Sequence, residues 1–276
     1  MLRMRPFLCL QRGRCYIQSS SSGSNSSNSS SSSSSLSTAF EEIAKTRQYT
    51  WSFDAKRPIP PPLLTKLLEV SQTAPSSFNL QPFKVIAVRG TDAKAALSAS
   101  MLGPGNGQRV RDAPVTIVYI SDKEPMRLTR QLMAIETAGG ADASYVNSLP
   151  AILGSLFGNN GFISTRIRRL VTHMASPLAP APVIPTDLTA WAIKNTIFSA
   201  QTFMLACAAE GVATAPMEGF DERRLCFALG VPPERYSIPL VVAVGYPKGT
   251  SAAVRPKKRY ALQDICFSDR YGEKYN

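Results

Sequence analysis

Cationic and amide side chains recur in five separated groups along the sequence, and these residue types can bind an anion. A phosphate dianion is held best by converging charged donors, and arginine can bind it bidentately. The groups are, in chain order, Arg47 with the residues to Phe53; Pro75-Ser76-Ser77 with Asn79, Gln81 and Pro82; Asn106 with Arg109; Pro216-Met217-Glu218-Gly219; and Lys257 with Arg259. Judged alone, Arg47 could cap a helix and Lys257 to Arg259 could be an ordinary basic tail.

Other kinds of chemistry find little support in the sequence. His173 is the single histidine, and a lone histidine supports neither a metal cluster nor a hydrolase triad. The cysteines, at positions 9, 15, 207, 226 and 266, lack C-x-x-C spacing, which favours a reducing compartment over disulfides or zinc. The glycine cluster from Gly103 to Gly107 follows a predicted helix, whereas a dinucleotide-binding loop follows a strand and opens a helix. We therefore expect no metal site and no Rossmann domain.

The formal net charge of +12 is distributed unevenly along the chain. Four of the 31 lysines and arginines lie in the first forty residues, which leaves 27 basic and 19 acidic residues in the rest. The basic residues cluster at Arg166 to Arg169 and at Lys248 to Arg259. A nucleic-acid site would add exposed aromatic residues or a known motif, and neither is evident. A solvated face or an anion site is the better interpretation.

A long apolar helix is predicted over Leu188 to Ala209, and the other elements are organised around it. Apolar and small residues occupy nearly every face of it, which is typical of a helix buried all round. A membrane span would need about 20 nearly unbroken apolar residues, so no transmembrane segment is expected. Gly211 would end the helix, and Thr214 to Asp221 would form a rigid loop whose backbone amides point at a ligand. Asp221 is a candidate N-cap for the helix that follows.

Helices and strands alternate along the remaining chain, which predicts a sheet with helices on its faces. Helices are expected over 40–45, 61–74, 93–102, 126–138, 145–157 and 221–229. An extended segment is expected over 48–53, and buried strands over 84–88, 115–120 and 238–244. Pro75 to Asn79 reads as a turn, 176–185 as an extended loop and 257–276 as a tail. Residues 124–186 are interpreted as a lid or excursion from the domain.

The first forty residues have the composition of a targeting segment. They contain four arginines and no acidic residue, followed by a serine-rich tract from Ser19 to Ser35 that cannot bury apolar surface. This is the composition of a mitochondrial transit peptide, with a plastid as the less favoured destination and an ordinary disordered tail as the alternative. We expect residues 1–40 to be a leader and linker, and residues 41–276 to be one domain.

Taken together in this order, the five polar groups resemble the FMN-dependent nitroreductase family. The resemblance covers residues 40 to 265 apart from the excursion, and its most specific pieces are Pro75-Ser-Ser-Phe-Asn-Leu-Gln-Pro82 and the apolar helix running into Ala215-Pro-Met-Glu-Gly-Phe-Asp221. It implies an α+β fold with three α/β/α layers around a mixed sheet. It also implies a homodimer with the flavin at its interface, where the segment from Pro75 to Asn79 reaches the flavin bound mainly by the other subunit.

The same resemblance assigns roles to individual residues. Arg47, Lys257 and Arg259 match the phosphate positions, joined by Asn106, while Arg109 would approach the N1/O2 side of the flavin and Asn79 its pyrimidine edge. The Glu218 and Gly219 backbone amides would face N5. The other implied cofactor ligands are Gln48, Tyr49, Pro75, Ser76, Ser77, Pro216 and Met217. The chain departs from the family where Tyr49 replaces a small hydroxyl residue and Trp51 replaces a second cation. Arg109 is therefore expected to supply more of the positive charge that contacts the flavin.

The activity implied is hydride transfer from NADH or NADPH to FMN, and then electron transfer to a quinone or nitroaromatic acceptor by ping-pong turnover. No side-chain acid or base is obligatory, because the cofactor carries the bond chemistry. One alternative is a flavin-dependent dehalogenase or a flavin-modifying relative, which the excursion leaves open. Another is a basic mitochondrial protein that binds nucleic acid or anionic lipid through its arginine clusters.

Overall fold

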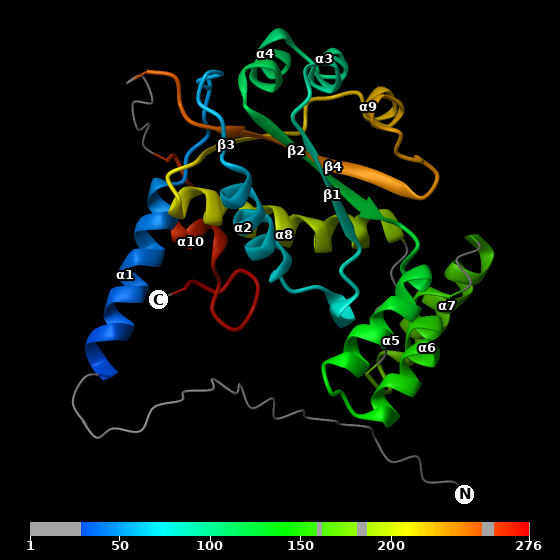
Figure 1. Ribbon diagram of the computed structural model, residues 1–276. Coiled ribbons are helices and arrows are strands. Elements are labelled where there is room, and N and C mark those ends of the chain that lie inside the picture. Colours follow the sequence, from blue (N-terminus) through cyan, green and yellow to red (C-terminus); the bar gives the residue numbers. More distant parts are fainter. Residues whose placement is uncertain (1–28, 159–161, 181–186, 250–256, 276) are drawn as a thin grey trace, which may run out of the picture. The chain divides into compact units, whose positions relative to one another are not determined.

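The core of the protein is a four-stranded sheet with helices on both faces, seen in a computed structural model (Figure 1). The structure describes residues 29–158, 162–180, 187–249 and 257–275. It divides the chain into two compact units, 1–40 and 41–276, and the sheet belongs to the second. Helix α1 (Ser29–Thr46) begins in the first unit and ends in the second.

The strands are β1 (Phe83–Val88), β2 (Val115–Asp122), β3 (Ala213–Met217) and β4 (Tyr236–Gly245), in the spatial order β1-β2-β4-β3. All three neighbouring pairs are antiparallel. In the described part of the chain, the only parallel pairing is an isolated bridge between Tyr49 and Thr214. The α+β class is therefore confirmed, and the predicted mixed character of the sheet is limited to this bridge at its β3 edge.

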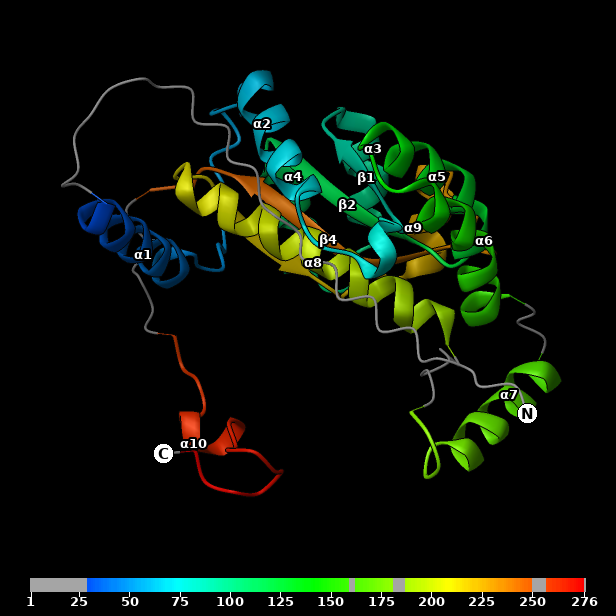
Figure 2. The same cartoon turned by 90° about the horizontal axis from the view of Figure 1, so that it is seen from below.

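Two helical layers cover the sheet (Figures 1 and 2). Helices α2 (Pro61–Gln72) and α8 (Leu188–Ala209) pack on one face, while α3 (Thr91–Ala99), α4 (Pro104–Asp112) and α9 (Glu222–Leu229) pack on the other. Because successive side chains of a strand point to opposite faces, Val242 and Val244 of β4 face α2 and α8, whereas Val241 and Ala243 face the other layer. The predicted α/β/α layering is confirmed.

Helix α8 has the predicted bounds, and Asp187 caps it by accepting from the backbone N–H groups of Thr189 and Ala190. Its buried side packs against α2 and the sheet. The prediction of a helix buried all round is wrong for a single chain, because Ile197 and Phe198 are 37% and 47% exposed. One face of this apolar helix is thus left uncovered.

The excursion contains η2 (Pro125–Leu128), α5 (Thr129–Ala138), α6 (Ala143–Phe157) and α7 (Phe162–Ala175). Leucines of the first three elements form a small core with Trp191 near the start of α8, so this part belongs to the domain. The helices predicted at 126–138 and 145–157 are confirmed, whereas α7 was not predicted. Of the loop predicted at 176–185, residues 181–185 lie outside the described residues.

Several local predictions are wrong for identifiable reasons. Of the serine tract predicted as an unstructured linker, Ser29 to Ser35 is helical, since serine is tolerated in a helix next to the better helix formers that follow it. Residues 1–28, the rest of the predicted leader, lie outside the described residues. Strand β1 is largely half-exposed because it is an edge strand. The glycine cluster at 103–107 lies mostly inside α4, which begins at Pro104, a residue suited to a first helical turn. Residues 214–217, predicted as loop, belong to β3, where an edge position tolerates Pro216.

The remaining elements are the turn η1 (Ser77–Asn79), predicted as such, and α10 (Leu262–Ile265) within the predicted tail. Cys207, Cys226 and Cys266 are free thiols. Among the residues with described coordinates, no helix has both the length and the apolar character to cross a membrane. The same residues contain no cluster of three or more His, Cys, Asp or Glu side chains that could hold a metal ion.

Candidate functional site

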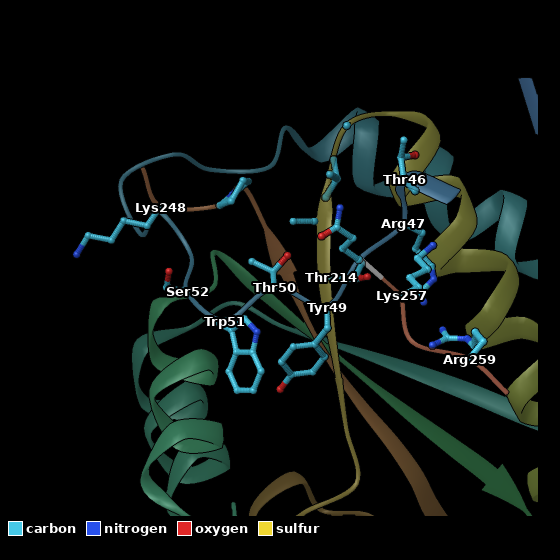
Figure 3. A pocket seen from close by; sticks show the side chains of 16 residues that line it. Thr46, Arg47, Tyr49, Thr50, Trp51, Ser52, Thr214, Lys248, Lys257 and Arg259 are labelled. Atoms are coloured by element: carbon cyan, nitrogen blue, oxygen red, sulfur yellow. The ribbon is translucent and has the colours of Figure 1, made fainter. Parts of the chain in front are cut away.

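A cavity of about 670 Å³ opens beside β3 and is the best candidate for a ligand site (Figure 3). Its wall comes from five parts of the chain: the segment after α1, the end of α8, the start of β3, the residues after β4 and the start of the C-terminal tail. The lining residues are Thr46, Arg47, Gln48, Tyr49, Thr50, Trp51, Ser52, Ala208, Gly211, Val212, Ala213, Thr214, Pro247, Lys248, Lys257 and Arg259.

The segment from residue 46 to 52 is held against the sheet by backbone hydrogen bonds. The Thr50 N–H donates to the Thr214 carbonyl at 3.1 Å, and the Lys248 N–H donates to the Ser52 carbonyl at 3.2 Å. Phe53, which is 1% exposed, anchors the end of the segment in the core. The side chains of this segment that line the cavity are therefore carried by a backbone fixed to both β3 and the end of β4.

Three cations gather on one side of the cavity: Arg47, Lys257 and Arg259 (Figure 3). The Lys257 ammonium group donates to the Ala44 carbonyl near the end of α1. Desolvation lowers the pKa of Lys257, and the positive charges of Arg47 and Arg259 lower it further. Within the described ranges no carboxylate forms an ion pair with any of the three. A concentration of uncompensated positive charge of this kind favours an anionic ligand.

A fourth cation, Arg109 of α4, lies close by but in a different environment, since it is only 7% exposed. Its Nη1 donates to the Asn106 Oδ1 at 2.9 Å. Its guanidinium carbon lies 4.8 Å from the centre of the Trp51 ring and 5.2 Å from that of Tyr49. Burial raises the pKa of Tyr49, and the charge of Arg109 partly opposes this rise. Arg109 thus connects α4 to the wall of the cavity.

The Nε of Arg109 is buried and has no hydrogen-bond partner among the described residues. A buried donor that is left unpaired is costly, by about 1–3 kcal/mol, and such groups are commonly satisfied by a water or a ligand. Arg109 therefore has spare hydrogen-bonding capacity at the place where α4 meets the two aromatic rings.

Asn106 also ties α4 to the segment that follows β3. Its Nδ2 donates to the Gly219 carbonyl at 3.3 Å, and the Leu102 N–H donates to the same carbonyl at 2.8 Å. A Cβ atom at Gly219 would lie 2.8 Å from the Asn106 Nδ2, so a larger residue here would push the Asn106 amide away. Asp221 then caps α9 by accepting from the Arg224 N–H, as predicted.

The predicted flavin segment from Pro75 to Asn79 does not line the cavity of the single chain. The Ser77 N–H donates to the Asn195 Oδ1 of α8 at 2.7 Å, and the Asn79 Nδ2 donates to the Glu136 Oε1 of α5 at 3.0 Å. Asn79 has a positive φ of 56°, in the left-handed region that asparagine tolerates better than most residues. The turn is thus fixed beside α8 and the excursion.

The structure brings together part of the predicted ligand set. Arg47, Gln48, Tyr49, Lys257 and Arg259 line the cavity, and Asn106, Arg109 and Gly219 form a hydrogen-bonded group linked to it through Tyr49. Glu218 is exposed at the end of β3, and Pro216 lies within that strand. The Met217 side chain is 3% exposed and belongs to the core, which makes it a packing residue.

Trp51, Thr214 and Lys248 line the cavity, although they were not predicted as individual cofactor ligands. What the three residues share is their place in the fold. Each lies where the segment after α1 pairs with the start of β3 or with the residues after β4. Periodicity alone does not show that the segment predicted as extended over 48–53 meets β3 and β4.

The fold and the site define an α+β protein whose sheet lies between two helical layers and whose principal cavity is rimmed by cations. The nitroreductase family model matches residues 44–105 and 173–246. The chain is also similar to a protein of Thermus thermophilus named NADH dehydrogenase, with 30% identity over 70% of this chain and 79% of the relative. This chain belongs to the nitroreductase family.

Solved structures show the same fold. A nitroreductase family protein of Streptococcus pneumoniae superposes with a TM-score of 0.63 at 21% identity, over 82% of this chain and 98% of the other. A protein of Exiguobacterium sibiricum, described as a nitroreductase in complex with FMN, gives a TM-score of 0.65 at 22% identity, over 82% of this chain and 95% of the other. These superpositions show the fold, and membership of the nitroreductase family makes the chain an oxidoreductase of nitroreductase type.

Proposed function

We propose that this protein is an FMN-dependent oxidoreductase that takes a hydride from NADH or NADPH and reduces a quinone or nitroaromatic acceptor by ping-pong turnover. The observation that carries the proposal is the cavity with Arg47, Lys257 and Arg259 on its rim, in a chain whose family includes a relative solved with FMN. When bound, FMN supplies the hydride chemistry, accepting two electrons from a nicotinamide and returning them to a second substrate.

The residues present fit such a cofactor. The cavity volume of about 670 Å³ lies in the usual range for small-molecule sites. The rim cations suit a phosphate dianion, because arginine donates to it bidentately and a lysine adds a point charge. The unpaired Nε of Arg109 can donate to a carbonyl or an anionic oxygen in the same region.

Arg109 would contribute to turnover by electrostatics. Asn106 and the two aromatic rings hold its guanidinium in place before any substrate binds. A fixed cation beside a site where negative charge develops stabilises that charge without reorganisation of the protein. This role is consistent with the replacement of a second family cation by Trp51, which leaves Arg109 as the buried positive charge next to the cavity.

The direct test is an absorbance spectrum of the purified chain, recorded before and after anaerobic addition of NADH and then of a short-chain quinone. We expect flavin bands that bleach with the donor and return with the quinone. A nitroaromatic compound and a halogenated tyrosine, added in place of the quinone, distinguish the acceptor classes. A colourless protein that takes up no added FMN would contradict the proposal.

We also propose that the protein works as a homodimer assembled over the uncovered face of α8. Ile197 and Phe198 of this face are exposed, as is Phe78 of the neighbouring turn at 39%, and apolar patches of this kind mark interaction sites. Phe198→Glu should shift the mass measured by sedimentation from dimer to monomer. Phe227→Glu on α9 is the matched control, because Phe227 is 91% exposed. A wild-type monomer at micromolar concentration would contradict the dimer.

The arginine-rich, acid-free leader supports a further proposal, that the protein is imported into mitochondria. Residues 1–40 fused to a fluorescent reporter should direct it to mitochondria. The control is the same fusion with all four arginines changed to glutamine, at Arg3, Arg5, Arg12 and Arg14. It should not be imported into mitochondria. Import of both fusions, or of neither, would oppose the assignment.

A further inference from the structure

Helix α7 (Phe162–Ala175) is amphipathic and exposes a row of apolar side chains. Ile167, Leu170, Val171 and Met174 are 57%, 59%, 60% and 68% exposed. They recur at the spacing of three and four residues that places them on one face of a helix. In the described part of the chain none of them belongs to a core cluster of the domain.

The charge of this region has one sign. Arg166 and Arg169 are exposed residues of α7, and the sequence contains no aspartate or glutamate between Asp142 and Asp187. At about 100° per residue, Arg166 lies beside the apolar row, about 90° from its centre, whereas Arg169 lies about 150° from that centre, on the opposite, polar face. An apolar row with arginines at its edge and on the opposite face, in a stretch of sequence without acidic residues, is the pattern of a helix that lies in a membrane interface.

We propose that α7 is a docking helix for an anionic lipid surface. Its 14 residues are too few to span a bilayer, so the helix would lie parallel to the surface. The apolar row would enter the acyl boundary, and Arg166 at its edge would contact lipid phosphates, while Arg169 on the opposite face would add positive charge within a Debye length of the surface. Charge complementarity favours this occupant over a second copy of α7, because two copies of this helix both carry positive charge and offer no acidic residue to each other. A nucleic acid would satisfy the arginines but leave the apolar row in water.

The experiment is co-sedimentation of the full chain with phosphatidylcholine vesicles, with and without phosphatidylglycerol. We expect binding that requires the anionic lipid and weakens as salt is added. Arg166→Gln with Arg169→Gln should weaken binding on the order of thirty-fold, as two cations at an anionic surface imply. Leu170→Gln with Met174→Gln should weaken it about a hundredfold through lost apolar burial.

Matched controls lie on α9, where Arg223 and Arg224 are exposed and Phe227 is 91% exposed. Arg223→Gln with Arg224→Gln removes the same charge elsewhere, and Phe227→Gln removes exposed apolar surface elsewhere. Both should leave vesicle binding unchanged. Every variant keeps the same basic leader, so any binding by the leader is common to all. Circular dichroism of each variant confirms that it folds.

Three results would overturn the proposal. The first is equal vesicle binding by wild type and both α7 variants, and the second is equal binding to neutral and anionic vesicles. The third is dissociation of the protein by Leu170→Gln with Met174→Gln in the absence of lipid, which would show that the row is covered by a second copy. Flavin content and turnover of NADH in solution are not expected to change, so failure here is distinguishable from failure of the proposed oxidoreductase activity.

Discussion

The two groups of positive charge around the cavity differ in how they are held. Arg47, Lys257 and Arg259 lie at the cavity wall, repel one another and have no carboxylate partner in the described ranges. Arg109 is buried, hydrogen-bonded to Asn106 and placed over two aromatic rings. The first group has an unfavourable arrangement that an anion would relieve, whereas the second is already fixed by the protein.

This difference implies a division of work. A group of mutually repelling charges is stabilised most when an anion binds, so it governs the affinity for that anion. Salt screens this contribution. A buried, preorganised charge is stabilised less by ligand binding, but it strongly stabilises negative charge that develops during the reaction. Variants of the two groups should therefore affect different measured quantities.

The largest effect is expected for Arg109→Ala. Removing a preorganised cation commonly costs a factor of about 10²–10³ in rate, so kcat/KM for NADH oxidation should fall by about this factor, with a smaller change in FMN affinity. Arg111→Ala on the same helix is the control, because Arg111 bonds to Ser98 and Gln108 instead. An Arg109→Ala enzyme with normal turnover but poor FMN retention would reverse the division of work.

Lys257→Ala with Arg259→Ala should chiefly weaken FMN binding. Hydrogen bonds to charged groups contribute about 1.5–3 kcal/mol each, so the double substitution should raise the FMN Kd by at least about a hundredfold in a fluorescence titration. The effect should shrink in high salt, and the dimer should stay intact. The outer lysine Lys258 offers a control substitution. Wild-type FMN occupancy in the double variant would contradict the phosphate assignment.

The pH dependence of FMN affinity should report on Lys257. The folded pKa of Lys257 is lowered, so its charge destabilises the folded protein fully below that pKa, and this destabilisation is lost as the pH rises from the folded pKa to the unfolded one. A phosphate ligand favours the protonated lysine, and FMN affinity should therefore fall as the pH rises through a range below the usual lysine pKa.

Two variants test the origin of that pH dependence. Arg259→Ala removes one cause of the lowered pKa and should move the fall in affinity to higher pH. Lys257→Arg should abolish the fall, since arginine stays charged. An unchanged profile in Lys257→Arg would assign the titration to another group.

The smallest effect is expected for Trp51→Ala. A cation–π contact at an exposed position contributes about 0.5–1 kcal/mol, and the Trp51 ring is 63% exposed above Arg109. Thermal unfolding should show a loss of stability of this size, and Trp51→Phe should recover part of it. A larger loss would mean that Trp51 anchors the segment as well as covering Arg109.

Much of the sheet and of the helical layers could be predicted from the sequence. Strands β2 and β4 have continuous apolar runs, and α8 lies between a capping Asp187 and Gly211. These are strong local signals, because capping and burial act over neighbouring residues. Helix α4 was missed because its glycines are poor helix residues, although Pro104 at its first turn was a usable signal.

The site was predictable as a set of residues but less so as an arrangement. The charges at Arg47, Lys257 and Arg259 are visible in sequence, and the structure places them on one wall. The stacking of Arg109 on Trp51 depends on the approach of α4 to a segment more than fifty residues earlier. Such long-range contacts leave no local pattern, which is also why Trp51 and Lys248 were not predicted as individual cofactor ligands.

The bridge between Tyr49 and Thr214 has a consequence for the free edge of the sheet. Strand β3 lies at an edge, and the segment from 47 to 52 covers part of its backbone, next to Pro216, which has no N–H to offer. An uncovered edge strand is a template for pairing with other chains. The segment that supplies Arg47 to the cavity thus also covers an edge of the sheet, and a chain that released this segment would expose backbone groups able to pair with another chain.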